Sequence, residues 1–395
     1  MITSIEAQEI ISQNITSLPL QTLDIRDSLG FVLAYDVMAQ IDLPPFNKSA
    51  MDGYVIGQGD DLSDDNRIFE VAGIIQAGQV YEQNIPKGKA IKIMTGAMLP
   101  PNAGKVIIKE NVSTENNSIS VEKIDLAKNI CLKGEDITNG KKLYSAGQKI
   151  TPLILANIIS AGISKVDVYS QPRFGILATG SELLECGSEY KAGHIYNSNG
   201  PLLHSLLNQR GYTTIQELSG QDTLELLRQR FEELLDESDI VFLTGGVSAG
   251  DFDFVEEILQ QTNCTVHFNK IAVKPGKPFT FATKDNKLIF AFPGNPVSVF
   301  TSFFLFALPA LYQAQGTEFK HAIAEYELAV DFKRDKTRRE LYLPVSVVNN
   351  SQMAPVDYHG SGDLYGLSKA DGLMIVPAGV NAINKGEKAA VIKIC

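Results

Sequence analysis

The chain has 395 residues, of which 44% are hydrophobic and 21% are charged. This composition is typical of a globular protein of roughly two to four domains, and it excludes a fibrous or disordered chain. Acidic residues outnumber basic residues by 46 to 35, and the net charge of −11 argues against non-specific binding to DNA or anionic membranes. A small anionic ligand is compatible with this charge, because it needs only a local basic pocket.

The ends of the chain and its apolar runs indicate a soluble, cytoplasmic protein. The first residues lack the basic start and apolar core of a signal peptide. The longest apolar run, 297–312, is shorter than the ~20 residues of a membrane-spanning helix, and Pro309 interrupts it. We therefore expect a core or interface helix there. The four cysteines form no CxxC pair, which favours reduced thiols over a zinc site or a disulfide framework.

The first 170 residues predict a short helix followed by a small β-rich domain. Thr3 and Glu6 have the spacing of a capping box, which predicts a helix start. Residues 41–140 contain short β-branched runs separated by Gly, Pro and Asn, a pattern typical of strands and turns. Residues 1–40 and 141–170 are assigned to an N-terminal and linker region, which includes a predicted helix over 152–161.

Residues 171–316 alternate between strand and helix patterns. The predicted strands and helices are 174–178, 199–209, 212–218, 222–237, 239–244 and 253–260. Such alternation predicts a doubly wound α/β domain with a parallel sheet, whose ligands bind beyond the carboxyl ends of the strands. Residues 317–395 are again β-rich and are assigned to a C-terminal β domain.

Glycine-rich loops with acidic residues follow two of these strands. Glu182 lies in the first loop, and Asp251 and Asp253 lie in the second. Glycines let backbone N–H groups approach a phosphate, and acids beside phosphate suit a bridging divalent metal. A tight turn without a ligand would give the same glycine pattern. The P-loop, the dinucleotide-binding GxGxxG and the HExxH motif are absent from the sequence.

Three lysines between residues 270 and 277 favour an anion site. Lys270 and Lys274 are four residues apart, so a straight strand would direct both to one face. A Pro-Gly pair then places Lys277 on a turn. A solvated edge strand is the alternative. Pro293 and Pro296 come next, in a loop that either directs a helix N-terminus toward the same crevice or is a plain connection.

The β-rich region contributes polar turns that would be ordinary if each stood alone. Asp52 precedes Gly53, Thr95 precedes Gly96, and Asp136 follows a Gly-Glu pair. The five histidines show no metal-ligand spacing, and we assign none of them a role.

Taken together, eight motifs occur in an order that resembles the MoeA family of molybdopterin molybdenumtransferases, to which the gephyrin E domain belongs. The motifs are PPFNKSAMDGY, TGAMLP, GED, ATGSEL, NSNG, TGGVSAGDFD, KPGKP and FPGNPVS. The resemblance implies an αβα domain like those of MoaB and Mog, a β-barrel-like C-terminal domain, and a homodimer. It implies insertion of molybdate into adenylylated molybdopterin with release of AMP, with a divalent cation such as Mg²⁺. Other proteins of molybdenum cofactor biosynthesis are possible partners.

The resemblance also implies roles for particular residues. The acids implied in catalysis are Asp52, Asp136, Glu182, Asp222 and Asp253. Of these, Glu182 and Asp253 are the implied metal ligands, and Asp52 and Asp136 are implied to close the site across the dimer. The residues implied in binding the substrates are Thr95, Gly180, Ser181, Gly245, Gly246, Ser248, Lys270, Lys274, Pro293, Pro296, Arg338 and Ser361.

The chain departs from the family pattern at three positions. Gly104 stands where the family usually has Asp, and Leu132 and Leu343 stand where it has Arg. Two alternative functions share part of the resemblance. A molybdopterin adenylyltransferase has the same αβ domain, but the motifs of the β-rich region argue against it. A non-catalytic scaffold like gephyrin has no need for the acids, so their presence favours an enzyme.

Overall fold

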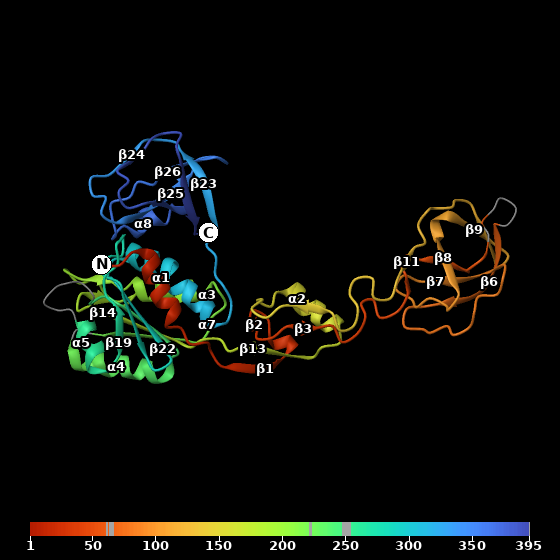
Figure 1. Ribbon diagram of the computed structural model, residues 1–395, viewed down its shortest axis with the longest axis horizontal. Helices are drawn as coiled ribbons and strands as arrows, with labels where there is room; N and C mark the ends of the chain where they lie inside the picture. Colours follow the sequence, from red (N-terminus) through yellow and green to blue (C-terminus); the bar gives the residue numbers. More distant parts are fainter. Residues whose placement is uncertain (61, 63–66, 221–222, 247–253, 395) are drawn as a thin grey trace. The chain divides into compact units, whose positions relative to one another are not determined.

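The computed structural model describes residues 1–60, 62, 67–220, 223–246 and 254–394 (Figure 1). The chain forms two compact units. We call them the β-rich unit, Thr22–Leu29 with Leu33–Val168, and the αβ unit, Met1–Gln21 with Gly30–Val32 and Tyr169–Cys395.

The β-rich unit is built around one six-stranded sheet. Its strands are β5 (Gly53–Gly57), β6 (Ile68–Ile75), β7 (Lys89–Ile93), β8 (Ala103–Ile108), β9 (Val112–Glu115) and β10 (Ser118–Val121), in the spatial order β8-β5-β7-β6-β10-β9. β5 is buried along its whole length, because β8 and β7 flank it on both sides. Val55, Ile91 and Val106 are fully buried in its core. The predicted β-rich character of this region is confirmed.

Smaller elements complete the region before the αβ domain. They are β1 (Leu20–Asp24), β2 (Val32–Leu33), β3 (Val37–Met38), β4 (Lys48–Ser49), β11 (Ile130–Cys131), β12 (Lys142–Tyr144), β13 (Lys165–Tyr169), and the 3₁₀ turns η1 (Ile25–Asp27) and η2 (Lys109–Asn111). The predicted helix is α2 (Pro152–Ser160). Thr151 caps it by accepting a hydrogen bond from Ile154 N, and Pro152 occupies the first turn, where its missing N–H costs nothing.

The αβ unit contains a six-stranded sheet with helices on both faces. The order is β17 (Ile215–Gly220), β14 (Phe174–Thr179), β18 (Ile240–Thr244), β22 (Lys287–Phe292), β21 (Thr280–Lys284) and β19 (Thr265–Phe268). The first four strands are parallel, as predicted, whereas β21 pairs antiparallel with both β22 and β19 and is thus the one strand of this sheet that runs in the opposite direction. Only Asp285 and Asn286 separate β21 from β22, and a connection this short can join only antiparallel neighbours.

Successive side chains of the parallel strands point alternately into two separate hydrophobic cores, one on each face of the sheet. Phe242 and Phe290 pack with the helices α1 (Ser4–Gln13), α3 (Asn199–Asn208) and α6 (Pro296–Ser302). Val241 and Ile289 pack on the opposite face with α4 (Leu224–Glu237) and α5 (Phe254–Gln261). This alternation is the period of two expected for a strand buried on both faces. The doubly wound αβα layer structure is therefore confirmed.

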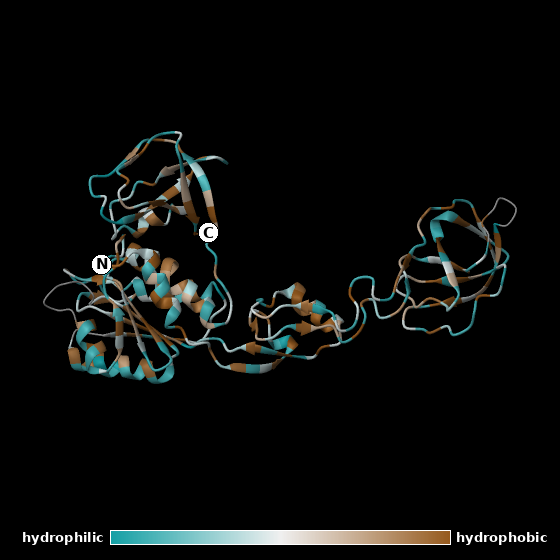
Figure 2. Ribbon diagram, in the orientation of Figure 1, coloured by the Kyte–Doolittle hydropathy of each residue, from teal (hydrophilic) through white to brown (hydrophobic). Residues whose placement is uncertain are grey.

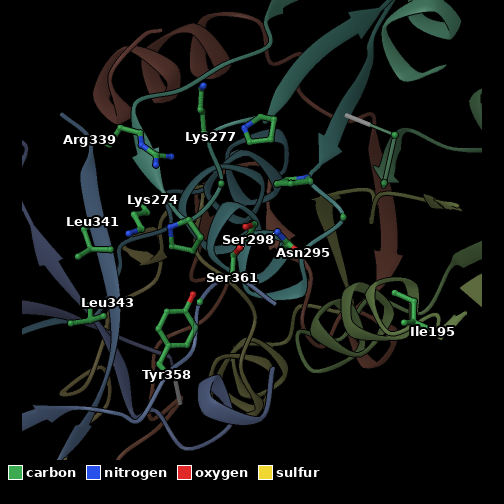
Figure 3. A pocket seen from close by; sticks show the side chains of 18 of the residues that line it. Ile195, Lys274, Lys277, Asn295, Ser298, Arg339, Leu341, Leu343, Tyr358 and Ser361 are labelled. Carbon is green, nitrogen blue, oxygen red and sulfur yellow. Dashed lines mark hydrogen bonds between the residues drawn. The ribbon is translucent and has the colours of Figure 1, made fainter. Parts of the chain in front are cut away.

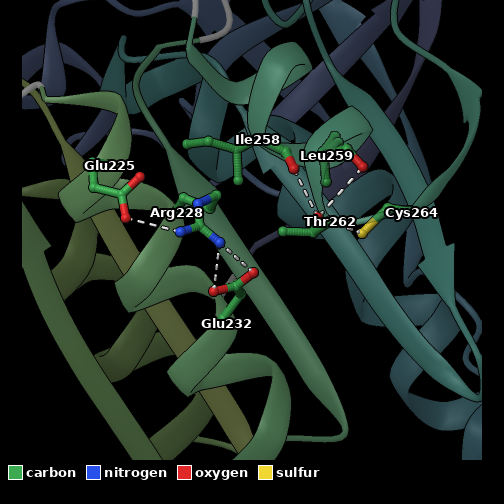
Figure 4. A network of polar contacts seen from close by, with 7 residues as sticks. All are labelled: Glu225, Arg228, Glu232, Ile258, Leu259, Thr262 and Cys264. Atoms are coloured by element: carbon green, nitrogen blue, oxygen red, sulfur yellow. Dashed lines mark hydrogen bonds and ion pairs between the residues drawn. The ribbon is translucent and has the colours of Figure 1, made fainter.

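Helices α4 and α5 show how the outer surface of this layer is stabilised (Figures 2 and 4). α4 carries both hydrophobic and hydrophilic residues, and Arg228 on it pairs with Glu225 at 2.8 Å and Glu232 at 2.9 Å, one turn away in each direction. After α5, the Thr262 hydroxyl donates a hydrogen bond to the Ile258 carbonyl at 2.7 Å and satisfies an acceptor at the helix end.

The last part of the chain closes into a small barrel. Strands β25 (Glu340–Val347), β26 (Gln352–Pro355), β23 (Ile323–Leu328), β29 (Lys388–Lys393) and β27 (Gly372–Val376) pair in that order, and β27 pairs back to β25. The remaining elements nearby are β24 (Phe332–Lys333), β28 (Ala382–Ile383) and α8 (Leu364–Leu367). The short strand β20 (Val273–Lys274) of the preceding domain adds to β25 in parallel. The predicted barrel-like domain is confirmed.

The apolar run predicted as a core helix is continuous from Pro296 to Ala314. It comprises α6, a π-helical segment (Phe303–Ala307) and α7 (Leu308–Ala314). By length and composition this helix could span a membrane, yet 78% of its most apolar window is buried inside the fold. Pro309 has no N–H to donate to the Leu305 carbonyl. The side chain of Gln8 on α1 donates to that carbonyl instead, at 3.1 Å.

We expect the Gln8→Ala variant to lower the free energy of unfolding by about 1 kcal/mol, because the Leu305 carbonyl loses its side-chain donor. Urea unfolding followed by circular dichroism measures this loss. Gln13→Ala, at the other end of α1, is the matched control and should change stability little. Equal effects of the two substitutions would contradict the prediction.

Candidate active site

A cavity of about 870 Å³ lies at the carboxyl ends of the parallel strands in the αβ unit (Figure 3). One side is lined by Thr179 at the end of β14 and Gly180 after it, by Gly245 and Gly246 after β18, and by the 293–295 loop after β22. Residues of the C-terminal barrel line the other side, including Arg339, Leu343 and Ser361. This is the position at which doubly wound sheets bind their ligands.

The floor of the cavity depends on a close approach between loops. Gly245 has a φ of +90°, and a Cβ there would overlap the carbonyl oxygen of Thr179. The side chain of Asn199 then links two loops: its Nδ2 donates to Thr244 Oγ1 at 2.9 Å and to the Gly294 carbonyl at 2.7 Å. Asn199 is the first residue of α3, and its side-chain amide links the ends of β18 and β22.

The predicted lysine turn reaches the cavity only in part. Lys274 and Lys277 line it, whereas Lys270 is exposed and lines none of the described cavities. Only Val273–Lys274 is paired as a strand, so the straight strand expected over 270–274 does not form. Gly276 has a φ of +107°, and a Cβ there would lie 2.7 Å from Ser302 Oγ, so glycine lets the turn pack closely on α6.

The barrel docks its Gly-Ser-Gly loop onto the start of α6. Asn295 Nδ2 donates to Ser361 Oγ at 2.9 Å, and Val297 N donates to the Ser361 carbonyl at 3.1 Å. The second bond satisfies a backbone donor in the first turn of the helix. The two bonds together hold the loop against the start of α6. Ser361 and Pro293, both implied by the family resemblance, thereby line the same cavity.

The lining of the cavity is positively charged in a protein that is negative overall. Among the described residues that line it, Glu182 is the one acid. The cations are Lys274, Lys277, Lys333, Arg334 and Arg339. Burial also raises the pKa of Tyr358, on the barrel side, to about 12, so its hydroxyl stays neutral at physiological pH. The arrangement suits an anionic molecule with a flat apolar part, since Leu341 and Leu343 line the same wall.

A second polar cluster lies in the β-rich unit. Gly53 pairs with Ile93, and this register brings Asp52 beside the turn that follows β7. Asp52 Oδ1 accepts from Thr95 N at 2.9 Å and from Thr95 Oγ1 at 3.0 Å, and Lys109 Nζ lies 3.5 Å from Oδ2. The backbone hydrogen bond from Thr95, then its side-chain bond and Lys109, hold the pKa of Asp52 below its usual value. Asp52 therefore stays ionised well into the acidic range.

The remaining predicted site residues do not line the 870 Å³ cavity or lie outside the described residues. Asp136 is exposed on its loop, where its N–H donates to the Leu43 carbonyl, and it does not join the Asp52 cluster. Pro296 lines an adjacent cavity of about 300 Å³ that also includes Glu182. Arg338 is exposed and lines another cavity of about 490 Å³. Ser181 is exposed. Asp222, Ser248, Asp251 and Asp253 lie outside the described residues.

The structure adds lining residues that sequence reasoning did not select. Arg334, Arg339, Tyr358 and Asn295 all line the cavity, and Figure 3 shows the last three of them. Asn295 lies between the two prolines that we singled out, so its loop was identified but its side chain was not. The arginines belong to a region without any local motif. Leu343, one of the departures from the family pattern, lines the cavity, whereas Leu132 is exposed in the β-rich unit.

Comparisons with known proteins cover nearly the whole chain. Family models match residues 2–162 as the MoeA N-terminal region, 175–313 as a probable molybdopterin-binding domain, and 325–394 as the MoeA C-terminal region. The molybdopterin molybdenumtransferase of Staphylococcus epidermidis is 34% identical over 94% of this chain and 90% of its own length. The one from Staphylococcus aureus is 34% identical over 98% and 93%.

Solved structures agree with this assignment. Two crystal structures of the molybdopterin biosynthesis protein moeA from Pyrococcus horikoshii match the chain with a TM-score of 0.82 each, at 29% and 27% identity. They cover 100% of this chain and 99% and 100% of their own chains. The fold and the site thus define a multidomain protein with a molybdopterin-binding-type αβα domain, and the chain belongs to the MoeA family.

We expect Thr95→Val to raise the pKa of Asp52 toward its ordinary value, because the hydroxyl donor is lost while the backbone N–H donor remains. A carboxyl NMR titration of the full chain measures the change. Because the pKa of Asp52 is depressed in the folded protein, the difference emerges as the pH falls below about 4 and is absent at pH 7, where the carboxyl is ionised in both proteins. Thr95→Ser, which keeps the hydroxyl, should leave the pKa low.

Proposed function

We propose that the chain is a molybdopterin molybdenumtransferase that inserts molybdate into adenylylated molybdopterin and releases AMP. The observation that carries the proposal is the cationic cavity at the strand ends of a molybdopterin-binding-type domain, in a chain whose net charge is −11. Both substrates are anions, and the apolar wall at Leu341 and Leu343 suits the flat rings of the pterin or the adenine. The curated relatives that match nearly the full length carry this name.

In this reaction the protein positions the two substrates and neutralises their negative charge, and it forms no covalent bond with them. Water attacks the phosphoanhydride that joins AMP to the pterin and AMP leaves, and the two dithiolene thiols replace two oxygens of molybdate, which depart with the thiol protons as hydroxide. Lys274 and Lys277 offset the negative charge of the oxyanions, as cations do in phosphoryl transfer generally. The turn at Gly245 and Gly246 lines the cavity without side chains, so a phosphate can approach its backbone closely, although the Gly245 N–H itself donates to the Phe292 carbonyl at 3.3 Å.

Mg²⁺ is part of this proposal. In phosphate-binding sites this ion uses one or two carboxylates, with water and phosphate oxygens as the remaining ligands. Glu182, which is exposed in the lining of the cavity, fits that requirement for a carboxylate. Asp253 is the proposed second ligand. When bound, the ion would neutralise charge on the phosphate groups.

The adenylyltransferase alternative is disfavoured by the domains on either side of the αβα domain. The match to the MoeA N-terminal and C-terminal regions extends the likeness well beyond that domain. We further propose that the protein acts in the cytoplasm, together with other proteins of molybdenum cofactor biosynthesis.

The direct test is the release of AMP from adenylylated molybdopterin in the presence of Mg²⁺ and molybdate. We expect Glu182→Gln to reduce the rate at least a hundredfold, because the substitution keeps the shape of the side chain and removes its charge. Glu189→Gln, an exposed acid outside the described cavities, is the matched control and should retain the wild-type rate. A wild-type protein that releases no AMP under these conditions would contradict the proposed activity.

The homodimer is also a proposal, and helix α2 supports it. Ile158 is the one buried residue of this apolar helix, whereas Leu153 is 83% exposed and Ile159 is 45% exposed. Contiguous exposed apolar surface marks interaction sites, and these exposed side chains of α2 are the proposed centre of such a patch. A second copy of the chain is the proposed partner.

We expect the double substitution Leu153→Glu and Ile159→Glu to convert the dimer to a monomer, because it introduces charges into an apolar interface. Light scattering after size-exclusion chromatography gives the mass directly. Ile323→Glu, which places a charge at an exposed apolar position of the barrel, is the control and should leave the mass unchanged. A monomeric wild-type protein would refute the dimer.

A further inference from the structure

We propose that Asp363 is a positioning residue of the candidate active site, which acts through the Gly-Ser-Gly loop and not by touching a substrate. The inference rests on the proposed function and deepens it, because Asp363 determines where Ser361 lies in the cavity. Gly360 and Ser361 line the 870 Å³ cavity, and Gly362 lines the 300 Å³ cavity beside it. Asp363 follows the loop directly and lines none of the described cavities.

The carboxylate of Asp363 closes the chain around the loop. Its Oδ2 accepts a hydrogen bond at 3.0 Å from the N–H of His359, which precedes the loop. Its Oδ1 accepts a hydrogen bond at 2.8 Å from the N–H of Gly366, in the helix α8 that follows the loop. We call these two bonds the Asp363 clamp. One side chain thus ties together the two segments between which the loop is held.

The carboxylate of Asp363 fits closely in its place. Its side chain is 19% exposed, and a Cβ on Gly366 would lie 2.6 Å from its Oδ2, so glycine leaves the room that the carboxylate occupies. The N–H groups of His359 and then of Gly366 hold the pKa of Asp363 below its usual value. The clamp is therefore ionised at neutral pH, and hydrogen bonds to an ionised acceptor are the stronger kind.

The loop that is clamped has little stiffness of its own. Gly360 has a φ of +112°, and the two glycines on either side of Ser361 have the freest backbone of any residue. On the side of α6, Ser361 is held by Asn295 Nδ2 at 2.9 Å and by Val297 N at 3.1 Å. The Asp363 clamp holds the loop on the side of the barrel. Without it the loop is anchored at one side only.

A role confined to helix capping is the alternative for Asp363. Its bond to Gly366 N is that of an N-cap, since Asp363 is the N-cap residue of α8. Its bond to His359 N lies on the other side of the loop and contributes nothing to the cap. Serine is also a good N-cap residue, but its single oxygen on a shorter side chain cannot accept from both donors. Asp363→Ser therefore separates capping from the clamp.

The first measurement is backbone hydrogen exchange, followed by NMR on the full chain, and it does not depend on activity. In Asp363→Ser the Val297 amide should exchange roughly tenfold faster, because the Ser361 carbonyl that accepts its hydrogen bond loses its fixed position. The Val299 amide donates to the Asn295 carbonyl within the same helix turn and is the internal reference, which should not change.

Asp60→Ser is the matched control. The carboxylate of Asp60 likewise accepts from two backbone N–H groups, those of Gly57 at 3.1 Å and Gly88 at 3.2 Å. It lies in the β-rich unit and lines none of the described cavities. The control makes the same chemical change away from the loop, so the exchange of Val297 and the kinetic constants should remain those of the wild type.

Steady-state kinetics of AMP release give the second measurement. Asp363→Ser should raise the KM for molybdate or for adenylylated molybdopterin about tenfold and change kcat much less, since a loop that serves binding alters KM before it alters kcat. A helix that merely loses part of its cap becomes less stable and moves neither constant.

Combining Asp363→Ser with Ser361→Ala tests whether Asp363 acts through the loop. Because both substitutions affect the same interaction at the cavity, the double variant should show the KM of the worse single variant rather than the product of the two effects. Asp363→Asn has the same shape and one acceptor fewer, so it should show the same changes to a smaller extent. It replaces Asp363→Ser in every measurement if thermal unfolding shows that the serine variant does not fold.

Three results overturn the inference. They are unchanged exchange of Val297 in a folded Asp363 variant, faster exchange with an unchanged KM, and effects of Asp363→Ser and Ser361→Ala that multiply. Failure of the proposed function gives a different result. Wild-type protein that releases no AMP contradicts the transferase activity, and the exchange of Val297 then decides by itself whether Asp363 holds the loop.

Discussion

The parallel pairing of β20 with β25 is the contact on which the candidate site depends. Two residues of the αβα domain, Val273 and Lys274, add to the edge of the barrel strand, and this pairing brings Lys274 and Arg339 together at the cavity. The N-terminal segment reinforces the same junction. Ile2 bridges to Ile271, and the Glu340 carboxylate accepts hydrogen bonds from Ser4 Oγ at 2.6 Å and from the Tyr342 hydroxyl at 2.8 Å. Strand pairing thereby holds the αβα domain and the barrel together at the cavity that both of them line.

A single buried helix supports the other side of the site. α6 begins at the loop that carries Pro293 and Asn295, receives the Gly-Ser-Gly loop of the barrel, and lies beneath the lysine turn at Gly276. Its interruption by a π-helical segment and Pro309 is compensated by Gln8 from α1. The apolar core of the αβ unit therefore positions the polar loops that line the cavity.

The charge of the main cavity is opposite in sign to the net charge of the chain. A chain with a net charge of −11 repels anions on average, yet the described lining of the main cavity has five basic residues and one acidic residue. A small anion that enters the cavity responds to the electrostatic field of the residues lining it rather than to the net charge of the whole chain. The Asp52 cluster in the β-rich unit shows the converse arrangement, in which a carboxylate is kept ionised by donors from Thr95 and a nearby lysine.

Local patterns in the sequence determined the elements, whereas tertiary pairing decided which side chains meet. The helix start at Thr3 and Glu6 and the helix after Thr151 follow from capping chemistry and residue spacing within a few residues. Family motifs located Asp52, Glu182 and Lys274, because these lie in recognisable loops. Arg339 has no such signal. Its place beside Val273 requires a register between segments 66 residues apart, and no local pattern encodes that register.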